Sequence, residues 1–228
     1  MAVEEGFDTF TMFEFGAGWG PWMATTGTAC KMRGGFKTVN LVGVEAEASK
    51  IPLIQRHLTK NRLMSEGYHL KSSIDNINTT IYQGVVNTDN KPMKFPLVSK
   101  ENYGASLLEG TFFYSCSSLI DVPGYSAPLL FSSYDLIDLV HVDIQGYEGV
   151  LFWDVATINA FKQKVKYICL GTHSRKIEGN LFEHLYNNGF RLIREKPCRV
   201  TLPPSSPKSF VDITQMDGTQ IWRNMTLA

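Results

Sequence analysis

The sequence predicts an α/β fold with a doubly wound, mostly parallel β-sheet and flanking helices. Two observations carry this prediction: strand and helix patterns alternate along most of the chain, and a glycine-rich segment joins the first strand to the first helix. The 228 residues, of which 43% are hydrophobic, are enough for one large domain with a full core. We therefore expect residues 1–228 to form a single domain.

Short apolar runs rich in β-branched and aromatic residues predict the strands. The expected strands cover residues 10–15, 38–44, 79–86, 136–143, 165–170 and 190–194. Two further runs flank Asp217-Gly218, a dipeptide typical of a hairpin turn, so we expect the last strand to lie antiparallel at an edge. The prediction is thus a seven-stranded sheet, mostly parallel with one antiparallel edge strand.

Apolar residues at helical spacing predict helices between these strands. The expected helices cover residues 20–32, 49–66, 148–161 and the region around 181–186. Residues 87–134 interrupt the alternation with a long irregular stretch rich in Ser, Tyr, Phe and Pro. Such stretches are often lids or binding loops, and an ordinary crossover is the alternative. The sequence leaves both interpretations open.

The charge balance bears on the kind of partner. The 22 basic and 22 acidic residues cancel, so neither nucleic acid nor a membrane surface is expected as the main partner. No apolar stretch approaches the about 20 residues of a membrane span, and no signal peptide is visible. Free thiols are expected at four widely spaced cysteines, namely Cys30, Cys116, Cys169 and Cys198. A cytoplasmic location is the resulting expectation.

The segment FEFGAGWGPW, residues 13–22, predicts a ligand site. Glycine lets the backbone approach a ligand closely, and the following helix start offers free N–H groups. Dinucleotide-binding loops need G-x-G-x-x-G, whereas Gly16, Gly18 and Gly20 form G-x-G-x-G. Pro21 stands where the third glycine is expected and lacks an N–H donor, which argues against NAD. A tight glycine turn without a ligand is the alternative.

An acid ends the second predicted strand. Glu45 follows the glycine loop by roughly 25 to 30 residues, a spacing at which a carboxylate can accept hydrogen bonds from both ribose hydroxyls. Glu47 is a competing acid nearby, and a solvated surface glutamate is the other interpretation. We prefer Glu45 as the ribose ligand.

The glycine loop and the stretch HVDIQGYEGVLF, residues 141–152, together resemble the FkbM-like family of class I S-adenosylmethionine-dependent methyltransferases. Asp143, Gly146 and Glu148 match an acid–hydrophobic–acid–Gly–x–Glu motif of that family, while Gln145 replaces its usual second acid. Two further stretches look like family segments, GASL at 104–107 and the run at 118–137. The likeness covers residues 10–195 approximately.

The resemblance implies a Rossmann-like class I methyltransferase fold, S-adenosylmethionine as cofactor and S-adenosylhomocysteine as product. It also implies O-methylation of a hydroxyl on a small molecule or sugar. The cofactor-binding residues that it implies are Glu14, Gly16, Ala17, Gly18, Gly20, Glu45, Val86 and Asp143. Among these, Val86 at the end of the third strand is the expected contact to adenine.

Two residues are candidates for catalysis. Asp143, at the end of the fourth strand, can orient the sulfonium or accept a proton, and a helix N-cap is the alternative. His173, after the fifth strand, is the candidate base because a histidine pKa of about 6.5 suits proton transfer. The family often has an acid where this chain has Gly171, and an ordinary loop histidine is the alternative.

Other polar residues near the strand ends receive weaker assignments. Gln145 and Tyr147 are expected to contact the acceptor, whereas His141, inside the fourth strand, is expected to be a core histidine with its hydrogen bonds satisfied. No metal is expected, because hard cations need several oxygen ligands and only one carboxylate is well placed.

Three broader hypotheses stay open. A non-catalytic or regulatory cofactor-binding domain is the main alternative to a methyltransferase, because the same fold serves many functions. A nucleotide-dependent oxidoreductase is the third hypothesis, weakened by Pro21.

Many relatives have a helix ahead of the first strand, which here starts within roughly ten residues of Met1. We therefore expect a missing N-terminal segment of a longer chain, or a homodimer, to cover the site.

Overall fold

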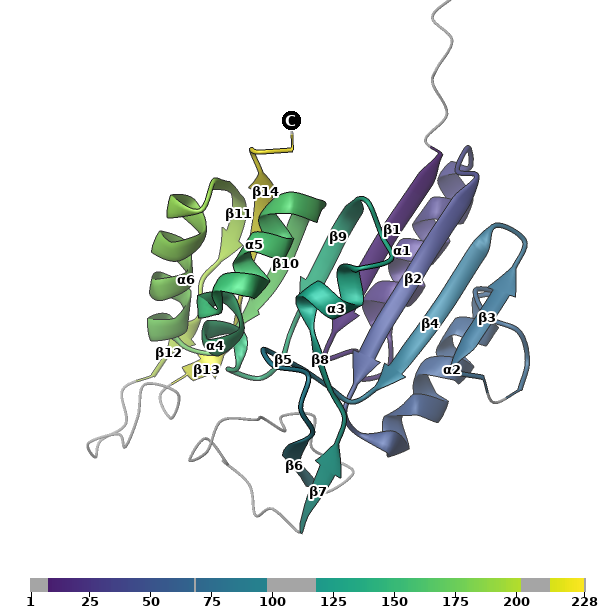
Figure 1. Ribbon diagram of the computed structural model, residues 1–228, viewed down its shortest axis with the longest axis horizontal. Coiled ribbons are helices and arrows are strands. Elements are labelled where there is room, and N and C mark those ends of the chain that lie inside the picture. The colour runs from purple at the N-terminus through teal and green to yellow at the C-terminus, as the bar shows by residue number, and fades with distance from the viewer. Residues whose placement is uncertain (1–7, 68, 98–117, 202–213, 228) are drawn as a thin grey trace, which may run out of the picture.

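A computed structural model describes residues 8–67, 69–97, 118–201 and 214–227 (Figure 1). Helices cover both faces of a central eight-stranded sheet with the strand order β11-β14-β10-β9-β1-β2-β4-β3. The predicted α/β, doubly wound Rossmann-like fold is therefore confirmed. The strands of this sheet are β1 Thr9–Phe15, β2 Thr38–Glu45, β3 Lys71–Ile74, β4 Ile77–Gln83, β9 Ile137–Val142, β10 Val165–Thr172, β11 Phe190–Lys196 and β14 Gly218–Asn224.

Most of the sheet is parallel, as predicted. Strands β4, β2, β1, β9 and β10 pair in parallel, whereas β14 is antiparallel to both of its neighbours, β10 and β11. Strand β3 adds a short antiparallel pairing to β4 at the other side of the sheet. Because the parallel strands share one direction, their carboxyl ends meet at one edge, which is where ligands bind in open α/β sheets.

Three details of the predicted sheet are wrong. It has eight strands rather than seven, and β14 lies between β10 and β11 rather than at an edge. Within the described residues no hairpin forms around Asp217, because β13 (Thr214–Met216) pairs with β12 (Arg199–Val200). The turn signal is local, whereas packing decides strand pairing: Trp222 of β14 is completely buried in the main core, which favours an interior strand.

The described part of the chain between residues 85 and 134 forms two small sheets and a short helix, and the β6–β7 sheet lies below the main one in Figure 1. β5 (Val85–Asn87) pairs with β8 (Gly124–Ser126), and β6 (Met93–Leu97) pairs with β7 (Ser118–Val122). The predicted third strand therefore ends at Gln83, and the chain leaves the main sheet after it. The predicted strand and short helix at 118–137 are found, while the family-like stretch at 104–107 lies outside the described residues.

The helices divide between the two faces of the sheet. Two of them pack with Met12 and Leu41 on one face, and the other four pack with Phe13 and Phe15 on the opposite face. The first group is α1 Pro21–Arg33 and α2 Ile51–Lys60; the second is α3 Ala127–Phe131, α4 Glu148–Trp153, α5 Val155–Lys164 and α6 Arg175–Asn187. None of the helices within the described ranges is long and apolar enough to cross a membrane.

The predicted helix at 148–161 is broken in two. Asp154 adopts an extended conformation between α4 and α5, and its carboxylate accepts a hydrogen bond from the Thr157 N–H at 2.7 Å. An aspartate that caps a helix competes with continuation of the preceding one, which explains the break.

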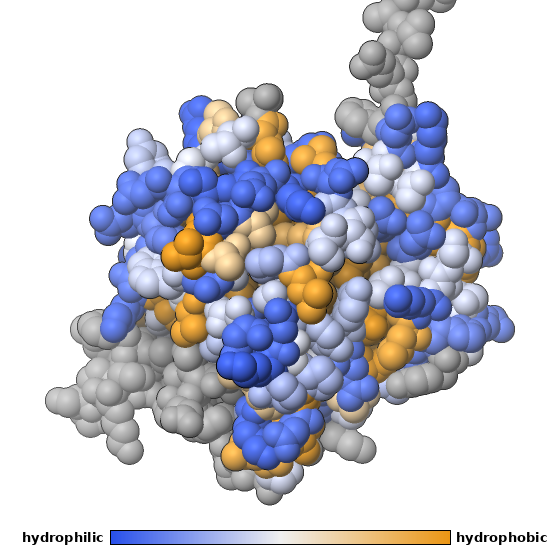
Figure 2. Space-filling view, viewed as in Figure 1, coloured by the Kyte–Doolittle hydropathy of each residue, from blue (hydrophilic) through white to orange (hydrophobic). Residues whose placement is uncertain are grey.

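Figure 2, in the same view as Figure 1, shows a largely hydrophilic face with separate hydrophobic patches.

The free-thiol prediction is confirmed for the cysteines that the structure describes. Cys30, Cys169 and Cys198 are all buried and unpaired, while Cys116 lies outside the described residues. Burial raises the pKa of the first two thiols to about 11, so they stay protonated at neutral pH. These cysteines act as small core residues.

Candidate active site

A cavity of about 240 Å³ opens at the carboxyl ends of β1, β2 and β9. It lies at the strand edge where the sequence motifs were expected to converge. The structure brings together there most of the predicted cofactor and acceptor residues, namely Glu14, Gly16, Ala17, Gly18, Glu45, Val86, Asp143 and Gln145. Phe95 and Lys50, which no motif indicated, also line it.

The glycine loop is held in left-handed backbone conformations, with φ of 76° at Gly16 and 57° at Gly18. A Cβ atom at Gly16 would lie 1.9 Å from the carbonyl oxygen of Asp143, so only glycine lets the loop lie against the end of β9. A Cβ atom at Gly18 would meet nothing within 4 Å, because this position is open. Gly20 stands at the start of α1 but does not line the cavity.

Glu14, at the end of β1, is tied to the start of α1. Its carboxyl oxygens accept hydrogen bonds from the N–H groups of Trp22, at 3.2 Å, and Met23, at 2.9 Å. These N–H groups belong to the first helical turn and have no partner within the helix. Burial raises the pKa of Glu14 to about 8. Both oxygens thus serve the helix, and a direct contact of Glu14 with a cofactor stays a prediction.

Replacing Glu14 with glutamine is expected to lower the free energy of unfolding by about 1–3 kcal/mol. The amide offers one acceptor oxygen to two N–H groups, so one buried N–H loses its partner. Urea denaturation at neutral pH measures this change. Glu66→Gln, at an exposed position, is the matched control and is expected to shift stability by less than about 0.5 kcal/mol. Equal stability of the two variants would contradict the capping role.

Glu45 connects the end of β2 to the glycine loop. Oε2 accepts a hydrogen bond from the Gly18 N–H at 2.6 Å, and Oε1 accepts one from the Glu47 N–H at 2.8 Å. Each oxygen keeps a further lone pair that can accept a hydroxyl. The competing acid, Glu47, pairs instead with Lys50 at 3.1 Å and does not line the cavity. The geometry therefore favours Glu45 over Glu47 as a ligand for a diol.

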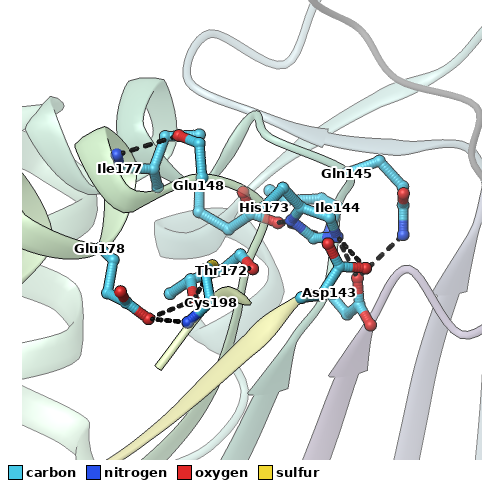
Figure 3. A network of polar contacts seen from close by, with 11 residues as sticks. Asp143, Ile144, Gln145, Glu148, Thr172, His173, Ile177, Glu178 and Cys198 are labelled. Carbon is cyan, nitrogen blue, oxygen red and sulfur yellow. Dashed lines mark hydrogen bonds and ion pairs between the residues drawn. The ribbon is translucent and has the colours of Figure 1, made fainter. Parts of the chain in front are cut away.

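Asp143 follows β9 and stands between the glycine loop and β10. Its Oδ1 accepts hydrogen bonds from Gln145 Nε2 and lies 3.1 Å from His173 Nε2, as Figure 3 shows. A Cβ atom at Gly171 would lie 3.1 Å from Asp143 Cγ, so this glycine leaves room for the carboxylate. Burial alone would raise the pKa of Asp143, but the neighbouring His173 lowers it below its ordinary value. Asp143 is thus a carboxylate at neutral pH.

His173 follows β10 and lies between two carboxylates (Figure 3). Its Nε2 is 3.1 Å from Asp143 Oδ1, and its Nδ1 is 3.1 Å from Glu148 Oε1. Burial alone would lower the pKa of His173, but these two acids raise it well above its ordinary value. The assumption of an ordinary histidine pKa is therefore wrong, since the ring is charged at neutral pH.

The predicted role of His141 as a satisfied core histidine is also wrong. Its ring stacks on Trp22 with centroids 4.4 Å apart, and its Nδ1 has no hydrogen-bond partner among the described residues. The side chain is nearly buried, and burial lowers its pKa to about 4, so the ring is neutral. His141 lines the cavity beside Asp143. His141 pairs with Cys169 of β10 and stands one residue before the end of β9, so it lies close to the carboxyl edge of the sheet, where the cavity opens.

A second cavity, of about 340 Å³, adjoins the first and shares Trp22, His141 and Asp143 with it. His173 and Gly171 line it from the end of β10. Its remaining lining residues come from β11 and from the chain around the start of β14, and these are Lys196, Met216, Asp217, Gly218 and Thr219. Sequence analysis missed these residues because no motif connects them with the glycine loop.

Tyr147 does not lie where sequence analysis placed it. It lines neither cavity, and its side chain, 8% exposed, belongs to the main core with Leu151 and Phe152. The turn after β9, in which the Tyr147 N–H bonds the Ile144 carbonyl at 3.3 Å, explains this orientation. An acceptor contact of Tyr147 is therefore not supported by the geometry.

A buried network fixes the backbone next to His173. The Glu178 carboxylate accepts hydrogen bonds from the Thr172 hydroxyl at 3.2 Å and from the Cys198 N–H at 2.9 Å (Figure 3). Arg175 donates to the same carboxylate at 2.7 Å. The end of β10 is thus joined to α6 and to the segment after β11, which holds the loop that carries His173.

Comparison with known proteins supports a methyltransferase. No family model matches the chain. A relative named "Putative methyltransferase", from Jannaschia sp. (strain CCS1), is 28% identical over 234 residues, which covers 100% of this chain and 77% of the relative. The solved methyltransferase FkbM from Methylobacillus flagellatus KT has a TM-score of 0.51 at 13% identity, covering 95% of this chain and 44% of that one. The fold is that of class I methyltransferases, and the relative supports methyltransferase function.

A weaker similarity is found to Streptococcus pneumoniae Sp1610, "a putative tRNA (m1A22) methyltransferase" solved in complex with S-adenosyl-L-methionine. Its TM-score is 0.46 at 8% identity, covering 96% of this chain and 68% of that one. The FkbM likeness concerns the fold, and membership of the FkbM-like family stays a prediction.

Proposed function

We propose that this chain is an S-adenosylmethionine-dependent methyltransferase that methylates a hydroxyl group on a small molecule or sugar. The observation that carries the proposal is that two cavities meet at Asp143, Trp22 and His141. Methyl transfer needs a cofactor and an acceptor in contact, so two adjoining cavities with a carboxylate and a histidine at their junction suit it.

The first cavity fits S-adenosylmethionine by the chemistry of its lining. Glu45 is a carboxylate with free lone pairs for the ribose hydroxyls, and Val86 and Phe95 form an apolar surface suited to adenine. The negative charge of Asp143 attracts the sulfonium end, and Gly18 leaves the loop backbone accessible. The bound cofactor would supply an activated methyl group, while the chain supplies orientation and charge.

The second cavity is suited to a hydroxylated acceptor. Asp143 and Asp217 offer carboxylate acceptors, Thr219 offers a hydroxyl, and Trp22 offers an apolar face against which a ring can pack. A hydroxyl acceptor must lose its proton as the methyl group arrives, and His173 is placed to take it once the ring has lost its own proton above neutral pH. The balanced charge of the chain supports a small acceptor over nucleic acid or a membrane.

Replacing Glu45 with alanine is expected to weaken S-adenosylmethionine binding by one to two orders of magnitude, about 1.4–2.8 kcal/mol. The reason is the loss of the ribose acceptor and of the Gly18 hydrogen bond. Calorimetric titration of the wild type and the variant measures the change. Glu47→Ala is the matched control, because Glu47 is a neighbouring buried acid that does not line the cavity.

A second measurement separates an enzyme from a cofactor-binding domain. Release of S-adenosylhomocysteine that depends on an added hydroxylated acceptor supports the enzyme. Tight cofactor binding with no release across sugars, polyols and phenols would favour a regulatory domain on the same fold. Absence of cofactor binding by the wild type would contradict the proposal itself.

A further inference from the structure

We infer that Glu148 is a positioning residue, which holds the imidazole ring of His173 in place and controls its charge. This inference rests on the proposed function, in which His173 takes the acceptor proton. It assigns a role to an acid that sequence analysis noted only as a motif match. Glu148 lines neither cavity and so acts on the acceptor only through His173.

The surroundings of Glu148 show why it depends on His173. The side chain is completely buried at the start of α4, and its Oε1 accepts a hydrogen bond from the Ile144 N–H at 2.8 Å. Its Oε2 has no hydrogen-bond partner within the described residues. A buried carboxylate is stable only with a compensating charge, and His173, 3.1 Å away, provides it.

The contact between the two groups is mainly electrostatic. Glu148 Oε1 lies within 3.1 Å of His173 Nδ1, yet the nitrogen lacks a well-aligned hydrogen bond. Charge attraction tolerates such misalignment, whereas a hydrogen bond weakens steeply with angle. The negative charge of Glu148, more than a specific bond, therefore determines the protonation of the ring.

Other groups around His173 act from the cavity side. Asp143 lies 3.1 Å from Nε2, Asp217 lies 4.0 Å from it, and Lys196 and neutral His141 line the same cavity. These groups can contact an acceptor, and their effect on the ring will change when the cavity fills. Glu148 faces the opposite nitrogen and stays buried, so its effect is constant through the reaction.

The consequence is a defined pH dependence. Only the neutral ring can take a proton, so the rate rises with pH until His173 has lost its proton. A nearby negative charge raises the pKa of His173 and moves this rise to higher pH. Removing the charge of Glu148 should therefore lower the pKa of His173 and move the rise in kcat/KM to lower pH.

A metal ion is the competing explanation for the same residues. Asp143, Glu148 and His173 offer atoms that lie within 4.8 Å of one another, so more than one carboxylate is present here, contrary to the sequence analysis. The two carboxylates, however, face different nitrogens of one ring, and one ion can bind only one of these nitrogens. The arrangement therefore suits a proton between two acids better than a metal.

The test is a proton-affinity measurement on the histidine ring by NMR, using the full chain without cofactor. His173 resonances are assigned by their loss in His173→Gln. In Glu148→Gln the pKa of His173 is expected to fall by at least about one pH unit, a tenfold loss of proton affinity. The internal control is His184 on α6, whose ring bonds the Phe152 carbonyl and should not shift. An unchanged His173 pKa would overturn the inference.

Two further arms keep the result unambiguous. Glu148→Asp keeps the charge but withdraws it from the ring, so a smaller fall is expected; this variant serves if Glu148→Gln does not fold. A cation site would give a different result with equimolar Mn²⁺. If Mn²⁺ selectively broadens the NMR resonances of His173 in the wild type but not in Glu148→Gln, the inference is overturned in favour of a cation site. Failure to find any methyl transfer would contradict the proposed function, whereas the NMR result would still stand on its own.

Discussion

Replacing Gly16 with alanine is expected to destabilise the chain by about 2–5 kcal/mol and to abolish cofactor binding, whereas Gly18→Ala is expected to cost about 1–2 kcal/mol. Both glycines have positive φ, so both variants carry backbone strain. Only at Gly16 does the added methyl group collide with backbone, 1.9 Å from the Asp143 carbonyl oxygen. Backbone cannot rotate away as a side chain can, so the loop and the end of β9 must separate.

Urea denaturation and calorimetric titration with S-adenosylmethionine measure the two effects. Each variant is the matched control for the other, because both replace glycine with alanine at a position of positive φ. A Gly16→Ala variant as stable as Gly18→Ala would show that the loop does not lie against β9. A stable Gly16→Ala variant with normal cofactor affinity would contradict the placement of the cofactor beside the loop.

The convergence of Gly16, Glu45, Asp143 and His173 could be predicted because strand alternation fixes it. Each of these residues follows, or ends, a predicted parallel strand, and carboxyl ends of parallel strands meet at one edge. Local patterns therefore placed residues distant in sequence around two adjoining cavities. The same logic predicted the helices on both faces, since apolar periodicity reports which side of each segment is buried.

Strand pairing at the sheet edges could not be predicted in this way. The dipeptide Asp217-Gly218 indicates a turn, but the partner of β14 is decided by burial of Trp222 against the main core. Strand β3 (Lys71–Ile74) has few apolar residues and depends on pairing with β4. Both features are tertiary, and short polar strands carry little periodic signal.

The polar surroundings of the site could not be predicted from the sequence either. Lys196 at the end of β11 and Asp217 between β13 and β14 line the second cavity, although no motif connects them with the glycine loop. The stacking of His141 on Trp22 of α1 is a tertiary contact as well. The altered pKa of His173 follows from two acids whose distances only a structure provides. Residue types alone give ordinary pKa values, and burial with neighbouring charge changes them.

Replacing His173 with glutamine is expected to lower kcat by about 10²–10⁴-fold while leaving S-adenosylmethionine affinity unchanged. His173 lines the second cavity and not the first, so its loss removes the proton acceptor without touching the cofactor. Rates of S-adenosylhomocysteine formation and calorimetric titration measure the two quantities. His184→Gln is the matched control, because this histidine lines neither cavity.

The stability of the same variant needs separate treatment. Loss of His173 leaves Glu148 as a buried, uncompensated carboxylate, which costs about 3–5 kcal/mol. The double variant His173→Gln/Glu148→Gln removes both charges and should recover much of that stability, but none of the activity. A double variant with wild-type kcat would show that His173 takes no proton. A single variant with impaired cofactor binding but intact folding would show that the two cavities do not act as separate sites.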